Sequence, residues 1–301
     1  MTNKDLTKYA WLSVVTAIAT ISLKSLAYFL TGSVSLLSDA LESVINLVAA
    51  AFALWMLIIA ARPADEDHPF GHYKAEYFAG ALEGALIGMA SLSIFWVAFQ
   101  RLFDPQPIEQ LGIGLFISGV ASVLNLIVGQ LLIRTGKANR SVALEADGHH
   151  LMTDVWTSVG VIFALIVVNL TGWFILDPII AMLVALNILK TGYEVIKRST
   201  LGLMDTVIND EDMEAVTSVL DGYVEKDRID YHALRTRQSG SRIFISVHIL
   251  MPDEWSIKRG HELIDKIEDD LRAAVEGCIV FTHMEPINDP ASMADIELEA
   301  A

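Results

Sequence analysis

The stretch VALEADGHHLMTDVWTSVGVIFALIVVNLT, residues Val142–Thr171, decides how this chain folds. It is long and apolar enough to cross a bilayer as a helix, which needs about 20 residues. Within it, His150 and Asp154 stand four residues apart, a spacing that stacks two side chains on one helix face. Because an ionisable pair is costly in hydrocarbon, its first interpretation is functional. The pair indicates a membrane protein that handles metal ions.

The rest of the chain predicts five more membrane helices. Its 301 residues are 53% hydrophobic and its mean hydropathy is +0.47, above the roughly 45–50% apolar content of soluble domains. The six apolar windows are Tyr9–Leu30, Leu36–Ala61, Glu76–Phe103, Leu111–Arg134, Val142–Thr171 and Asp177–Ile196. After about Leu203 charged residues return. We therefore expect a transmembrane all-α bundle over 1–203, a cytoplasmic α+β domain over 204–290 and a flexible acidic tail over 291–301.

Charge distribution predicts the orientation. Basic residues lie before the first window and in the turns after windows two, four and six; examples are Lys4, Lys74, Lys137 and Lys197. The turns after windows one, three and five have no lysine or arginine. By the positive-inside rule both termini are cytoplasmic. The first window is too long for a cleaved signal peptide and lacks a small-residue cleavage site, so we expect it to remain as a helix.

The part of the chain from Thr206 onward, called the tail domain below, is strongly acidic. It has nine basic and twenty-one acidic residues and so supplies most of the net charge of −16. Such a surface repels nucleic acid and attracts cations, although acidity also serves solubility. The only cysteine, Cys278, excludes an intrachain disulfide and a thiolate cluster.

A second polar pair lies in the second window, where SDALESVIN places Glu42 and Asn46 four residues apart. Asn46 alone is equally consistent with an interhelical hydrogen bond. Facing His150 and Asp154, however, the pair would complete a four-coordinate site. Its oxygen and nitrogen ligands suit zinc, iron, manganese, cobalt or cadmium. Without metal the two carboxylates would need protons, so metal and protons should compete. Glu83 is a weaker candidate that would face the bundle interior.

The turn RPADEDHPFGHYKAE, residues 62–76, contains Asp65, His68 and His72. Proline and glycine let such a turn fold back on an ion. The alternative is a solvated acidic turn, but two histidines among acids favour a second metal site.

The sequence pattern of the tail domain predicts the order helix, strand, strand, helix, strand. In the second strand Ile243, Ile245, Val247 and Ile249 share one face, so His248 points away from the aliphatic core. Histidines recur on all three strands and on the second helix, with an acid two residues after the last one. We predict a metal site from His232, His248, His261, His283 and Glu285.

Four motifs extend over nearly the whole chain: GSVSLLSDALE, PADEDHPFGHYKAE, EADGHHLMTD and HALRTRQSG. With them the chain resembles the cation diffusion facilitators, in the bacterial branch that exports zinc or ferrous iron. The resemblance implies a homodimer in the inner membrane with ferredoxin-like tail domains. It implies a transport site at Glu42, Asn46, His150 and Asp154, and the loop and tail sites given above. It also implies a charge pair between Lys74 and Asp205; the alternative is that Lys74 serves only as a positive-inside anchor.

One feature departs from the family's zinc pattern. Zinc exporters usually have aspartate or histidine and then aspartate in the second window, where this chain has Glu42 and Asn46. The amide removes one charge and one titratable group. Glu285 replaces the usual aspartate, which is a milder change.

We expect proton-coupled export of a divalent transition metal, zinc above iron, manganese, cobalt or cadmium, in a lipid membrane and without a nucleic-acid partner. A membrane metalloenzyme would typically need HExxH on a helix, and the sequence has no such motif. A third hypothesis is a metal sensor that uses only the tail ligands.

Overall fold

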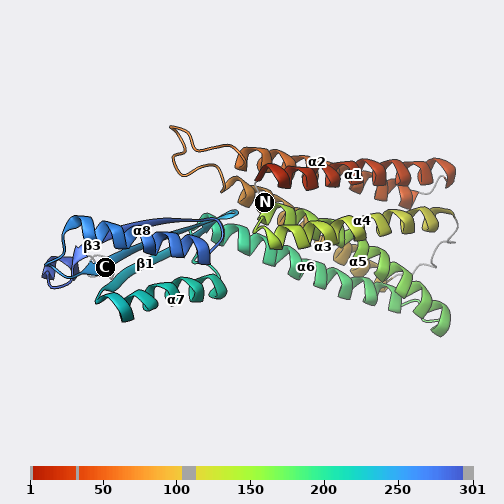
Figure 1. Ribbon diagram of the computed structural model, residues 1–301. Coiled ribbons are helices and arrows are strands. Elements are labelled where there is room, and N and C mark those ends of the chain that lie inside the picture. Colours follow the sequence, from red (N-terminus) through yellow and green to blue (C-terminus); the bar gives the residue numbers. More distant parts are fainter. Residues whose placement is uncertain (1–2, 32–33, 104–112, 294–301) are drawn as a thin grey trace. The chain divides into compact units, whose positions relative to one another are not determined.

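The computed structural model describes residues 3–31, 34–103 and 113–293. The chain divides into two compact units, residues 1–201 and 202–301. The first unit consists of helices that run side by side (Figure 1). They are α1 (Asn3–Thr31), α2 (Val34–Ala60), α3 (Ala75–Phe103), α4 (Ile113–Ala138), α5 (Val142–Thr171) and α6 (Leu176–Leu203).

Six helices therefore occur where six windows were predicted. Four described segments are long and apolar enough to cross a membrane: Leu6–Leu26, Ala75–Phe103, Gly119–Ala138 and Leu176–Leu203. Within the described part of α2 the apolar stretch is shorter, Asn46–Ala60. Four spans are thus supported by length and composition, while α2 and α5 as spans stay predictions.

The first part of helix α5, up to Leu151, is mostly buried, and α5 packs against α2, α3 and α4. Its start is fixed by Ser141, whose side chain accepts a hydrogen bond from the backbone N–H of Leu144 at 3.4 Å. Its end is fixed by Gly172, which has a left-handed φ of 71°. This placement turns the polar stripe of α5 toward neighbouring helices.

Glycines allow α4 and α5 to approach closely. A Cβ added to Gly148 would lie 2.8 Å from the carbonyl oxygen of Gly129, and one added to Gly129 would lie 3.1 Å from that of Gly148. Small residues permit such contact between membrane helices. The crossing lies directly beside the predicted ligands of α5.

The second unit has the predicted order, with α7 (Asp210–Asp227), β1 (Asp230–Ser239), β2 (Arg242–Met251), α8 (Ile257–Ala274) and β3 (Cys278–Pro286). A short 3-10 helix, Pro290–Met293, follows, and residues 294–301 of the predicted tail lie outside the described residues. The sheet order is β1-β2-β3; β1 and β2 are antiparallel, and β2 and β3 are parallel.

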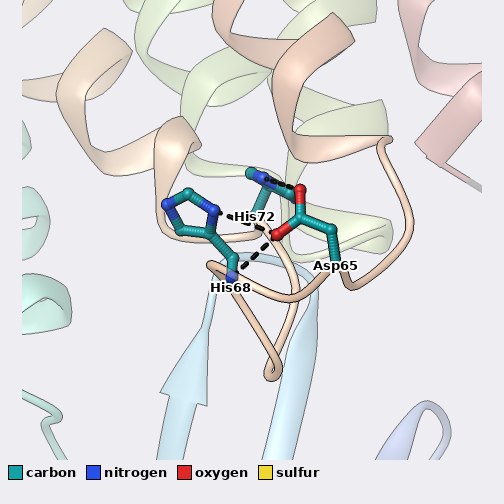
Figure 2. A group of neighbouring side chains, drawn as sticks. All are labelled: Asp65, His68 and His72. Carbon is teal, nitrogen blue, oxygen red and sulfur yellow. Dashed lines mark hydrogen bonds and ion pairs between the residues drawn. The ribbon is translucent and has the colours of Figure 1, made fainter.

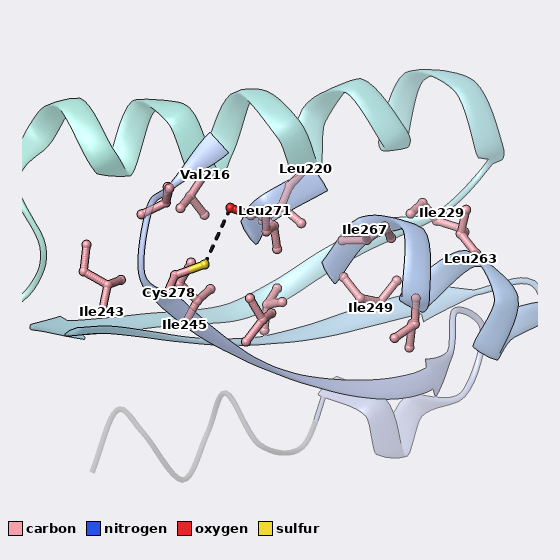
Figure 3. Close-up of a cluster of buried hydrophobic side chains, with 14 of the residues drawn as sticks. Val216, Leu220, Ile229, Ile243, Ile245, Ile249, Leu263, Ile267, Leu271 and Cys278 are labelled. Atoms are coloured by element: carbon pink, nitrogen blue, oxygen red, sulfur yellow. Dashed lines mark hydrogen bonds between the residues drawn. The ribbon is translucent and has the colours of Figure 1, made fainter. Parts of the chain in front are cut away.

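The core of this unit lies between the sheet and its two helices (Figure 3). Ile243 is 1% exposed and Ile245, Val247 and Ile249 are 0% exposed, which confirms the predicted inward face of β2. Cys278 belongs to this core, where its Sγ contacts the carbonyl oxygen of Leu271 at 3.6 Å. Because the alternate residues point away from the helices, the histidines of the strands lie on the sheet face opposite α7 and α8.

Candidate metal centres

The structure brings together three of the four residues predicted for the intramembrane site. Asn46, on α2, is 6% exposed, as is His150 on α5. The Asn46 Oδ1 lies 2.8 Å from His150 Nε2, and the Asn46 Nδ2 donates to Asp154 Oδ2 at 2.9 Å. The side chain of Glu42 lies outside the described residues. The amide of Asn46 thus joins both predicted ligands of α5.

Asn125, on α4, is a neighbour that the sequence argument missed. It is 2% exposed, and its Nδ2 donates to the same Asp154 Oδ2 at 3.0 Å. The amides of Asn46 and Asn125 therefore both donate to the Oδ2 oxygen of Asp154, and neither of these two hydrogen bonds involves Oδ1. An asparagine in an apolar helix was the available signal, but it did not indicate which helix it would face.

Two more acids lie in the interior. Glu83, on α3, is 1% exposed and its Oε2 lies 3.2 Å from His150 Nδ1. Asp147, also 1% exposed, accepts a hydrogen bond from Ser13 Oγ at 3.0 Å. The predicted inward orientation of Glu83 is confirmed, and its contact with His150 is new. His149 lies to the side, with its Nε2 3.9 Å from Glu145 Oε1.

The loop site is a compact group (Figure 2). The ligand atoms of Asp65, His68 and His72 all lie within 4.8 Å of one another. Asp65 Oδ1 accepts from the backbone N–H of His68 at 2.7 Å, and its Oδ2 lies 3.3 Å from His72 Nε2. This backbone hydrogen bond is the largest cause that lowers the pKa of Asp65 from its usual value. The loop therefore presents an ionised carboxylate between two imidazoles, a donor set that suits a divalent metal.

Gly71 allows this loop to close. Its φ of 84° is in the left-handed region, and its N–H donates to the carbonyl oxygen of His68 at 2.9 Å. The turn returns the chain so that His72 faces Asp65. The Nδ1 of His72 is buried without a hydrogen-bond partner.

In the tail unit the three strand histidines form a row across the sheet. His232 is paired with His248 in the antiparallel register, and His248 with His283 in the parallel one. Glu285 Oε2 lies 2.7 Å from His232 Nε2 and 3.4 Å from His248 Nδ1, while its Oε1 lies 3.6 Å from His283 Nε2. The Nδ1 atom of His232 is buried without a hydrogen-bond partner. These donors fit a zinc-like ion bound by imidazole and carboxylate.

The compact group of ligand atoms comprises His232, His248 and Glu285, and of the predicted tail ligands His283 and His261 are not in it. The Nε2 of His261 lies 3.6 Å from Asp265 Oδ2, one turn along α8, and its side chain is 66% exposed. It shares a surface hollow with His283, Asp265 and Glu268. His261 lies on α8, as its predicted helical position requires, and its side chain lines this hollow.

The predicted charge pair joins residues of different units, Lys74 and Asp205. In the second unit Asp205 accepts from Arg237 Nη1 at 2.9 Å. The pairing of Asp205 with Lys74 stays a prediction.

A unit of long apolar helices with buried carboxylate, amide and imidazole side chains, followed by a domain with a histidine-rich sheet, is typical of a membrane protein that moves cations. Family models agree with this class: "Cation efflux transmembrane domain" matches residues 10–204, and "Cation efflux protein, cytoplasmic domain" matches residues 208–287. The chain belongs to the cation diffusion facilitator family, whose members are transporters and not enzymes.

Individual relatives cover nearly the whole chain. An uncharacterized transporter of Synechocystis is 47% identical, over 97% of this chain and 94% of its own. The cation-efflux pump FieF of Shewanella oneidensis is 31% identical, over 91% and 92%. The solved metal-bound C-terminal domain of the CzcD transporter from Thermotoga maritima is 25% identical, over 26% of this chain and 91% of its own, with a TM-score of 0.24.

Proposed function

We propose that this protein exports a divalent transition metal from the bacterial cytoplasm in exchange for protons, as a homodimer in the inner membrane. The observation that supports the proposal most is the contact of Asn46, on α2, with both His150 and Asp154, on α5. Glu42 would complete this transport site. Zinc is the favoured substrate, and iron, manganese, cobalt and cadmium are alternatives with the same ligand preferences.

The negative charge of the proposed transport site accounts for the exchange of metal for protons. If Glu42 and Asp154 are ionised and His150 is neutral, a metal ion neutralises the two negative charges of the site. When the metal leaves, protons must replace it, because uncompensated carboxylates are costly in a membrane. Alternating access then requires only that the inward and outward states differ in their affinity for the metal.

The loop site and the tail site would respond to cytoplasmic metal. Asp65, His68 and His72 would bind one ion, and His232, His248, His283 and Glu285 would bind another, with His261 contributing from the neighbouring hollow. The matched cytoplasmic-domain model supports pairing of two tail domains. Both termini would be cytoplasmic, and Lys74 and Asp205 would form a charge pair.

A metal-tolerance assay distinguishes transport from sensing. Cells that lack their own zinc exporter would express the full chain, Asp154→Ala or His248→Ala. Asp154→Ala should abolish tolerance, because it removes a transport ligand, whereas His248→Ala should reduce it only in part. Full tolerance with Asp154→Ala, together with its loss in His248→Ala, would contradict transport through the membrane site and favour the sensor.

A further inference from the structure

Glu83 is a buried acid that the proposed transport site does not explain. It lies on α3, is 1% exposed, and neither carboxylate oxygen has a hydrogen-bond partner. Buried acids in membrane helices are expensive and usually have a function. Its Oε2 lies 3.2 Å from His150 Nδ1, a distance that a small rotation would turn into a hydrogen bond.

The imidazole of His150 lies between two acceptors. Its Nε2 faces Asn46 Oδ1 at 2.8 Å, and its Nδ1 faces Glu83. The orientation of Asn46 follows from Asp154 Oδ2, which accepts from both Asn46 Nδ2 and Asn125 Nδ2 and so leaves Asn46 Oδ1 toward His150. Without metal, Nε2 therefore bears the hydrogen that Asn46 Oδ1 accepts.

Metal binding reverses this requirement. To bind a cation, Nε2 must offer its lone pair, so a neutral imidazole must then have its hydrogen on Nδ1. Metal-bound histidines usually donate their second N–H to a carboxylate, which fixes the tautomer and strengthens the ligand. Glu83 Oε2 is an acceptor at that position.

We propose that Glu83 is a positioning residue: it accepts the Nδ1–H of His150 and so holds the tautomer in which Nε2 binds the transported metal. The inference rests on the proposed function, because it assumes that His150 is a ligand of that metal. Asn46 stabilises the opposite tautomer, so Asn46 and Glu83 compete for one imidazole. A metal ion shifts the balance toward Glu83.

Glu76 offers a matched control on the same helix. It lies seven residues before Glu83, so both share one face of α3 about 10 Å apart. It is 0% exposed, but its partners are the hydroxyl of Ser141 and the backbone N–H groups of Val142 and Ala143. Glu76→Gln thus makes the same chemical change at equal burial without touching His150.

The test uses full-length protein labelled with 15N-histidine in lipid, with zinc as the probe. His150 is assigned by comparison with His150→Gln. Zinc-bound wild type should show His150 protonated at Nδ1 and bound through Nε2. In transport assays Glu83→Ala should raise the zinc KM by about 10- to 100-fold, as loss of such partners does. Glu83→Gln should raise it less, because its amide oxygen still accepts, and Glu76→Gln should keep the wild-type KM.

Two results would overturn the inference: zinc bound through Nδ1 of His150 in wild type, or an unchanged KM and an unchanged His150 spectrum in Glu83→Ala. The spectrum of wild type decides even if a variant fails to fold. If wild type moves no zinc, the proposed function fails, while the His150 spectrum still tests the role of Glu83.

Discussion

At the residue scale, Asn46 determines the charge of the proposed transport site. Its amide donates to Asp154 and faces His150, so it links both proposed ligands without adding a negative charge. A carboxylate at this position would strengthen attraction for a divalent ion. It would also place two acids against each other when the metal is absent.

Asn46→Asp should therefore destabilise the metal-free protein and increase its stabilisation by zinc. Replacing the amide breaks a buried hydrogen bond, a loss of about 1–3 kcal/mol. Thermal unfolding with and without zinc measures both effects. Asn139→Asp is the control, since Asn139 bonds the carbonyl of Thr135 outside the site. An equal response to zinc in wild type and Asn46→Asp would contradict the assigned role of Asn46.

Spacing in the sequence predicted part of this site. Intervals of four residues placed Glu42 with Asn46 and His150 with Asp154 on common helix faces. Such intervals cannot reveal Asn125, because its contact with Asp154 depends on how α4 crosses α5. The contact of Glu83 with His150 depends in the same way on the packing of α3.

At the scale of elements, the crossing of α4 and α5 positions the proposed ligands of α5. Each of Gly129 and Gly148 leaves room for the backbone of the other. Gly148 stands between Asp147 and His149, within two residues of His150. Any widening of the crossing would move the ligand face of α5 away from Asn46.

Gly148→Ala should lower both stability and metal flux. Its Cβ would approach the Gly129 carbonyl oxygen at 2.8 Å, and overpacking of this kind costs about 1–3 kcal/mol. Thermal unfolding and zinc flux of the same preparation measure the two losses. Gly119→Ala on α4 is the control, since its Cβ would meet nothing within 4 Å. Wild-type flux in Gly148→Ala would show that the close crossing is not needed.

In the strands, the sequence pattern predicts which residues face the core but not which residues become neighbours across the sheet. Alternation predicted which residues of β2 face inward, and the structure confirms it. The row of His232, His248 and His283, however, depends on the pairing of three strands. The register of β1 shifts between His232 and Arg235, and Ala233 has a φ of 49°. Such an irregularity determines the neighbours of His232 and has no signature in the alternation.

At the scale of the whole molecule, the chain combines a membrane unit, which holds the proposed transport site, with an acidic domain. The tail supplies most of the net charge of −16, which would concentrate metal ions near it. Hydropathy and charge predicted this division. They do not give the substrate, because zinc, iron, manganese, cobalt and cadmium accept similar ligands.

The central claim is that the site of Asn46, His150 and Asp154 moves metal across the membrane. Full-length protein in proteoliposomes would be tested with a panel of divalent metals while the internal pH is recorded, with Asp154→Ala alongside. We predict that zinc enters wild-type vesicles as protons leave, and that Asp154→Ala abolishes both movements. Equal flux in wild type and Asp154→Ala, or no flux of any metal under any pH gradient, would contradict the account.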